Sequence, residues 1–545
     1  MNLESNRKKL NEEQKKAAFC EENAVVAAGA GSGKTMVLAH RFVWLLTEKD
    51  YKVDEILTLT FTKKAASQMF KRIYSLVSQI AQEESGIRAQ RAQKALDDFI
   101  HARIQTLDSY SASIVKQCAP RYGISPDFQI DQQRCYNIAL EVSYPFFIAH
   151  RHHPAVKRLY SVNRPNGIVR NIFADVLFNY CLIDKPRDFL ADLNFQIDTL
   201  CSQWDGYVKN VRKLLNDIKR DISCDNSLLP VLVPIIEKGK NEKIDIPTTV
   251  EVQEYFNQLQ NIPPESVIDE AEAHPLQKSF KKFLFFLYDV KSVSLRGGKR
   301  SDNTVKDNIY LLRNIYDSFS SLTISCMQAG FIVSIMSLLE KLQKRYLTKK
   351  RTEGVLTFRD VASLSRTILI EQTDIRRSEK DTFKSIMIDE FQDNNELQKD
   401  ILFLLAEKRN KLNKDVPPAE DLDKGKLFFV GDEKQSIYMF RGADVSVFRK
   451  LKEEIKSDNL TLTTNYRSSA GLIGAFNAIF GGIYTDSGGN NPPVKYNSVF
   501  AQSKTLPLYE AEYTPLQSVN SDSGNLSLYI LNKKTDTEEE DLKKK

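Results

Sequence analysis

The run from Val25 to Thr35 constrains the fold of this chain more than any other stretch. Four apolar residues lead into a glycine-rich turn that ends in Lys34 and Thr35. Glycines let a backbone fold so tightly that several N–H groups and a helix N-terminus point at one anion, and a lysine adds a point charge. A strand before the turn and a helical pattern after it are the context that a phosphate-binding loop requires. The alternative is a glycine-rich turn that binds no nucleotide.

The loop therefore predicts a nucleotide site, with the Thr35 hydroxyl as a ligand of Mg²⁺. The strict form of this pattern begins with Gly, where this chain has Ala28. The residues expected to surround the phosphates are Ala28, Gly29, Ala30, Gly31, Ser32, Gly33, Lys34 and Thr35.

The chain alternates strands and helices at both ends of its sequence but not in the middle. Strand-like runs at residues 56–61, 104–107, 386–388 and 427–430 alternate with helical patterns. This order is typical of an α/β fold with a parallel sheet, whose ligand binds at the carboxyl ends of the strands. Helical periodicity dominates between them. The predicted domains are 1–115 and 351–450 (two parts of one α/β domain), 116–350 (a large all-helical insertion) and 451–545 (the beginning of a second α/β domain).

Composition excludes several classes of protein. The seven cysteines are scattered and none is paired at metal-ligand spacing, so neither a disulfide framework nor a zinc site is expected. No apolar run approaches the roughly 20 residues that cross a bilayer, which predicts a cytoplasmic protein without a membrane partner. The net charge of +6 permits a polyanionic partner without demonstrating one. Residues 413–426 are rich in Pro, Asp and Lys and are expected to form a surface loop.

A pair of carboxylates supplies the groups that a phosphate loop needs for hydrolysis. Asp389 and Glu390 directly follow the apolar strand at 386–388, so a parallel sheet brings them to the same edge as Lys34. Asp389 is expected to hold Mg²⁺ together with Thr35, and Glu390 is the candidate general base.

Several segments together resemble a known family. Residues 388–393 (Ile-Asp-Glu-Phe-Gln-Asp) resemble motif II of the UvrD/Rep-like superfamily 1 DNA helicases, and residues 430–443 resemble motif III. Five further segments match in the order that the family requires: residues 10–14 (Q motif), 28–35 (motif I), 60–66 (motif Ia), 106–110 (motif Ib) and 465–469 (motif IV). Seven ordered matches are far more specific than one.

The resemblance implies two RecA-like domains, with ATP and Mg²⁺ as cofactors and 3′ to 5′ movement on single-stranded DNA or on a junction of single- and double-stranded DNA. It implies that Gln14 reads the adenine edge and that Tyr466 stacks on the base. Gln435 would contact the γ-phosphate or the attacking water. Arg467 would reach the γ-phosphate from the second domain. The catalytic set is thus Lys34, Asp389, Glu390, Gln435 and Arg467.

The DNA contacts implied by the resemblance combine aromatic faces that stack on bases with hydroxyls and a guanidinium that bind phosphates. For each residue, packing inside the fold is the alternative. The expected DNA-contacting residues are Phe61, Thr62, Thr106, Tyr438, Phe440 and Arg441.

Departures from the compact UvrD pattern leave the branch of the family open. Asp108 stands where UvrD-type members usually have His, which resembles the AddA/RecB-type branch, and the helical insertion is long. No motif V or VI follows the strand-like run at 526–531, so we expect a fragment with low activity on its own. One alternative is the motor of a helicase–nuclease, whose partner would be a nuclease or another member of a repair complex. The other is an ATP-responsive DNA clamp without efficient turnover.

Overall fold

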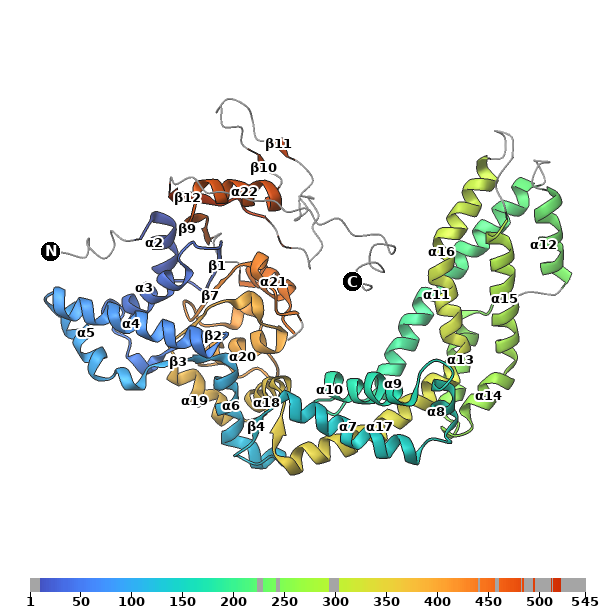
Figure 1. Ribbon diagram of the computed structural model, residues 1–545, viewed down its shortest axis with the longest axis horizontal. Coiled ribbons are helices and arrows are strands. Elements are labelled where there is room, and N and C mark those ends of the chain that lie inside the picture. The colour runs from blue at the N-terminus through green and yellow to red at the C-terminus, as the bar shows by residue number, and fades with distance from the viewer. Residues whose placement is uncertain are drawn as a thin grey trace, which may run out of the picture. The chain divides into compact units, whose positions relative to one another are not determined.

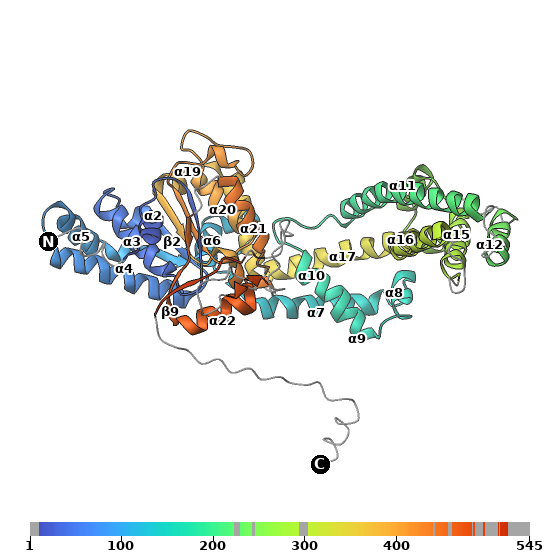
Figure 2. The ribbon, with the colours of Figure 1, turned by 90° about the horizontal axis from the view of Figure 1, so that it is seen from above.

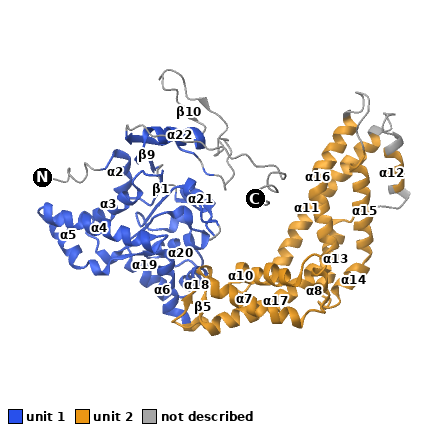
Figure 3. Ribbon diagram, in the orientation of Figure 1, with its two compact units in different colours: residues 1–119, 361–545 blue, residues 120–360 orange. Residues whose placement is uncertain are grey.

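The computed structural model describes residues 10–222, 229–241, 246–293, 303–439, 442–455, 460–481, 483–484, 494–495, 511 and 513–520. The chain divides into two compact units, one formed by residues 1–119 and 361–545 and the other by residues 120–360 (Figure 3). The strand expected at 526–531 lies outside the described residues, as do Phe440 and Arg441. The finer division into RecA-like domains stays a prediction.

The first unit is built on a six-stranded sheet in the order β3-β2-β6-β7-β1-β8, and all of its neighbouring strands are parallel (Figure 1). This confirms the predicted α/β fold class. The strands are β1 (Ala24–Ala28), β2 (Ile56–Thr60), β3 (Arg103–Thr106), β6 (Ser385–Ile388), β7 (Leu427–Gly431) and β8 (Leu460–Leu462).

The register of the sheet aligns its functional segments. Ala27 pairs with Gly431, and Leu59 pairs with Ile388. The residues that follow β1, β2, β6 and β7 therefore emerge along one edge of the sheet. Strand β8 also pairs with β1, so the segment just before motif IV belongs to this same sheet.

Helices cover both faces of the sheet (Figures 1 and 2). On one face, Phe428 and Val430 share a buried core with α3, α4 and α5. On the other face, the Phe429 ring lies 4.7 Å from that of Phe391, which contacts Phe448 of α21. The α-helices that begin in this unit are α2 (Glu12–Ala18), α3 (Lys34–Thr47), α4 (Lys63–Glu83), α5 (Ile87–Asp97), α6 (Leu107–Cys118), α19 (Thr373–Thr382), α20 (Glu396–Ala406), α21 (Val445–Ile455) and α22 (Ala470–Gly481). Helix α18 (Phe358–Glu371) crosses the boundary between the units.

Shorter elements complete the first unit. Strand β9 (Thr464–Ser469) pairs in parallel with β12 (Gln517–Asn520), and β10 (Ile483–Tyr484) pairs with β11 (Val494–Lys495). The short helices are η1 (Val53–Glu55), η2 (Phe99–His101), η3 (Ala119–Tyr122), η6 (Phe391–Asp393), η7 (Ala419–Asp421) and η8 (Glu433–Gln435).

The second unit is almost entirely helical. Its core includes Trp204, whose ring contacts Phe280 and Phe319. Its helices are α7 (Gln132–Ala149), α8 (Pro154–Leu159), α9 (Pro165–Gly167), the π-helix η4 (Ile168–Ala174), α10 (Asp175–Tyr180), α11 (Phe189–Ile222), α12 (Leu229–Asn241), α13 (Thr249–Gln260), α14 (Val267–Ala273), α15 (Pro275–Lys291), α16 (Asn303–Met327) and α17 (Ala329–Glu353), with β4 (Gln129–Ile130) paired to β5 (Val355–Leu356). Among the described helices, none alone has the length and apolarity to cross a membrane; α16 and α17 pass that test only as a pair, with a 65° bend between them.

Candidate active site

The phosphate loop joins β1 to α3 through two glycines in left-handed conformations, Gly31 at φ 70° and Gly33 at φ 87°. A Cβ on Gly31 would lie 2.7 Å from Nδ2 of Asn465, and one on Gly33 would lie 2.8 Å from Nε2 of Gln14. Both positions therefore require glycine for their backbone conformation and for the close approach of an amide side chain.

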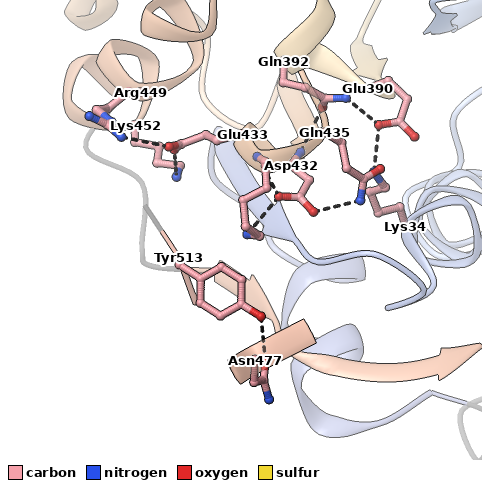
Figure 4. A network of polar contacts seen from close by, with 11 residues as sticks. Lys34, Glu390, Gln392, Asp432, Glu433, Gln435, Arg449, Lys452, Asn477 and Tyr513 are labelled. Carbon is pink, nitrogen blue, oxygen red and sulfur yellow. Dashed lines mark hydrogen bonds and ion pairs between the residues drawn. The ribbon is translucent and has the colours of Figure 1, made fainter. Parts of the chain in front are cut away.

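Lys34 brings three of the predicted catalytic residues together (Figure 4). Its Nζ lies 2.7 Å from Oε2 of Glu390 and donates to Oε1 of Gln435 over 3.2 Å. The Lys34 side chain is only 10% exposed, which keeps the contact largely out of water. The loops after β1, β6 and β7 thus meet at one ammonium group.

Two residues outside the predicted set extend this network. The Gln392 amide donates to Oε2 of Glu390 and accepts from the Asp432 N–H, at 2.8 and 2.9 Å. Gln435 donates to Oδ2 of Asp432 over 2.8 Å (Figure 4). Both residues lie inside the segments that resemble motifs II and III, so the motif strings contained the signal. Glu390 itself adopts φ 53°, a left-handed conformation that is uncommon for residues with a side chain.

Asp389 is buried at the end of β6. Burial raises the pKa of its carboxyl to about 7, and the nearby charge of Glu390 acts in the same direction. Burial likewise raises the pKa of Asp393 to about 6. A divalent cation at Asp389 would favour its ionised form.

The residues present fit a magnesium nucleotide. Thr35 and Asp389 offer only oxygen donors, which Mg²⁺ prefers, and Mg²⁺ takes most of its remaining ligands from water and phosphate oxygens. Within the described ranges, no cluster of three or more His, Cys, Asp and Glu side chains could hold a metal ion by itself. The Ser32 hydroxyl is buried in the loop and has no hydrogen-bond partner among the described residues.

Gln14 lies on α2 against the phosphate loop. It is 2% exposed, its Oε1 accepts from the Asn11 N–H at 3.0 Å, and its Nε2 donates to the Ser32 carbonyl at 2.9 Å. In this structure the amide therefore caps its own helix and holds the loop. Its role toward adenine stays a prediction.

Strand β9 places Tyr466 and Arg467 beside the loop. The Tyr466 N–H donates to the Gly31 carbonyl at 2.9 Å, and its ring is 41% exposed. Arg467 is also exposed. The structure thus brings both residues to the phosphate loop, while their contacts with a nucleotide remain predicted.

The expected DNA contacts divide into two kinds. The rings of Phe61, after β2, and Tyr438, after η8, contact each other with centroids 4.7 Å apart. The hydroxyls of Thr62 and Thr106 instead cap helices α4 and α6, each accepting a backbone N–H at 3.1 Å. This capping role was readable from the sequence, because threonine before a helix is a favoured N-cap.

Comparison with known proteins agrees with this arrangement. Residues 10–456 match the family described as UvrD/REP helicase N-terminal domain. The chain belongs to this family. The predicted resemblance is therefore confirmed.

The curated relatives bear a more specific name. Proteins named as the A subunit of an ATP-dependent helicase/nuclease are each 26% identical to this chain in Clostridium botulinum (strain Alaska E43 / Type E3), Clostridium beijerinckii (strain ATCC 51743 / NCIMB 8052) and Clostridium perfringens (strain ATCC 13124 / DSM 756 / JCM 1290 / NCIMB 6125 / NCTC 8237 / Type A). The matches cover 98%, 84% and 87% of this chain. The chain spans less than half of these relatives, at 44%, 38% and 38% of their lengths.

Proposed function

We propose that this chain is the ATP-binding part of a DNA helicase or translocase that moves 3′ to 5′ on single-stranded DNA. The observation that carries the proposal is the position of Lys34, which contacts Glu390 and Gln435 at the carboxyl edge of the sheet. A lysine, a carboxylate and an amide that converge on a phosphate loop are the parts needed to bind and hydrolyse a nucleoside triphosphate.

In this proposal Lys34 has two states. Without a nucleotide it pairs with Glu390, as the structure shows. Phosphate oxygens would draw the ammonium group toward the loop and leave the Glu390 carboxylate free to accept a proton from the attacking water. Thr35 and Asp389 would hold Mg²⁺, which offsets the negative charge of the phosphates when bound. Arg467 would stabilise the charge that develops on the γ-phosphate, and Tyr466 would stack on the base.

The phosphate site is connected to the proposed DNA face by a short piece of chain. Gln435 contacts Lys34, and three residues later Tyr438 contacts Phe61. We propose that these two rings stack on bases of single-stranded DNA or of a junction with a duplex. Loss of the γ-phosphate would then move Gln435 and loosen the grip of the rings on the strand.

A second candidate is the motor region of a cytoplasmic helicase–nuclease that acts together with a nuclease or another member of a repair complex. The names of the relatives and the presence of Asp108 favour it. Both candidates share the same ATP chemistry, so they differ only in what the whole protein does with DNA.

Steady-state ATP hydrolysis by residues 1–545, measured with and without single-stranded DNA, tests the proposal. We expect DNA to stimulate turnover, and we expect Glu390→Gln to abolish turnover while nucleotide binding persists. Glu55→Gln is the matched control, because Glu55 pairs with Lys384 at 2.8 Å at the opposite end of the sheet. Turnover that DNA does not stimulate, together with ATP-dependent DNA binding, would favour the clamp instead.

A further inference from the structure

Asn465 connects the phosphate loop to the strand that carries Tyr466 and Arg467. Its side chain is 2% exposed, and Nδ2 donates to the Ala30 carbonyl over 2.6 Å. Its Oδ1 accepts from the N–H groups of Arg467 and Ser468, both at 2.8 Å. One buried amide thus joins two segments that lie 435 residues apart in sequence.

The surrounding contacts make this connection tight. The Cβ of Arg467 lies 2.9 Å from the position that a Cβ on Gly31 would occupy, so β9 lies directly on the loop. Upstream of β9, the Glu13 carboxylate accepts from both the N–H and the hydroxyl of Thr463, at 3.0 and 2.8 Å. A shift of the loop is therefore expected to move β9 with it.

We propose that Asn465 is a positioning residue that couples the conformation of the phosphate loop to the placement of Arg467, so that the site distinguishes a triphosphate from a diphosphate. The proposal rests on the proposed function, because it takes the loop as the phosphate site and Arg467 as a γ-phosphate ligand. Asn465 itself need not touch the nucleotide. It acts through the Ala30 carbonyl on one side and the Arg467 N–H on the other.

The chemistry of the amide separates this role from that of a local turn. An aspartate or serine also accepts N–H groups two and three residues ahead, so the turn at Arg467 and Ser468 does not need asparagine. Only the Nδ2 donor reaches Ala30, and neither a carboxylate nor a serine hydroxyl on a short side chain replaces it. Asn465→Asp would place an oxygen against the Ala30 carbonyl and repel it. Asn465→Ser would remove the contact without adding charge.

A matched control exists at the other end of β1. Asn23 donates through Nδ2 to the Asp423 carbonyl at 2.9 Å and accepts from the Leu427 N–H at 2.8 Å. It makes the same kinds of hydrogen bond but lies away from the phosphate loop. Asn23→Asp therefore measures what loss of such a bridging amide does to the fold alone.

The experiment measures dissociation constants of a fluorescent ADP and of a fluorescent, non-hydrolysable ATP analogue with Mg²⁺, for wild type, Asn465→Asp, Asn465→Ser and Asn23→Asp. Loss of one hydrogen bond to a buried acceptor predicts about tenfold weaker binding of the triphosphate in both Asn465 variants. The diphosphate should be affected less, and Asn23→Asp should leave both constants unchanged. Thermal unfolding of each variant shows whether it is folded, and Asn465→Ser provides the test if Asn465→Asp does not fold.

Combination with Arg467→Ala decides whether Asn465 acts through the arginine. We expect Arg467→Ala alone to reduce the preference for triphosphate and Asn465→Ser to reduce it no further in the double variant. Equal weakening of both nucleotides, additive effects in the double variant, or Asn465 variants that match Asn23→Asp would overturn the inference while the proposed function stands. A wild-type chain that binds neither nucleotide would overturn both.

Discussion

Replacement of Glu390 by Gln should strengthen nucleotide binding even though it removes the proposed base. In the nucleotide-free structure, Nζ of Lys34 is held 2.7 Å from Oε2 of Glu390. Phosphate oxygens must compete with this carboxylate for the same ammonium group. The variant removes the competitor and, with it, a negative charge beside the phosphate site.

The exposure of the two side chains sets the size of the effect. Lys34 is 10% exposed and Glu390 is 34% exposed, so water screens the pair from one side. Such a half-exposed ion pair contributes about 1 kcal/mol, which corresponds to roughly fivefold tighter binding once it is removed. The gain should shrink as salt concentration rises, because screening also weakens the competing pair.

Titration with a fluorescent, non-hydrolysable ATP analogue at about 0.15 M salt measures this gain directly. Glu55→Gln serves as the control, since its partner Lys384 lies at the opposite end of the sheet. Unchanged or weaker binding by Glu390→Gln would refute the idea that Glu390 holds Lys34 back. The reasoning about two states of Lys34 would then be wrong, even if turnover were lost.

Two further predictions concern DNA binding and stability. Tyr438→Ala should weaken binding of single-stranded DNA by about 1–3 kcal/mol in fluorescence anisotropy, whereas Tyr74→Ala, an exposed ring on α4, should not; because Phe61 contacts Tyr438, the double variant should lose less than the sum. Burial lowers the pKa of Lys426 to about 8, so the folded state resists protonation below that pH. Lys426→Met should therefore stabilise the protein by about 2 kcal/mol at pH 7 in urea unfolding, after allowance for its lost bond to the Lys380 carbonyl, and the gain should fall as pH rises from 8 toward 10.5; an equal gain at pH 7 and 9.5 would contradict it.

The sheet and its catalytic edge could be predicted because their signals are local. An apolar run followed by a glycine turn marks β1 and the phosphate loop, and the apolar run before Asp389 marks β6. Parallel pairing then brings Lys34 and Glu390 to one edge without further information. The sequence could not show that Lys34 pairs with Glu390, because that contact depends on side-chain distances across 356 residues.

The segment at 413–426 illustrates the opposite case. Its polar composition predicts only a surface loop, yet both of its ends are tied to buried charges. Arg376 donates to the Asn413 carbonyl at 2.9 Å and pairs with the fully buried Glu407, which also pairs with Lys380 at 2.8 Å. Charged residues are rarely buried unless they are paired, and pairing of this kind leaves no periodic pattern in a sequence.

The order of strands in the sheet also determines when the sheet can form during synthesis. Ala24 of β1 pairs with Phe428 of β7, and β8, the other neighbour of β1, begins only at Leu460. At about 5–20 residues per second, a ribosome needs roughly 20–80 s to supply the partners of β1 after β1 itself has emerged. The helical unit at 120–360 is continuous in sequence, so it is free to fold during this interval. The strand that leads into the phosphate loop is thus among the first to be made and among the last to be paired, and chaperones have their longest opportunity to bind it.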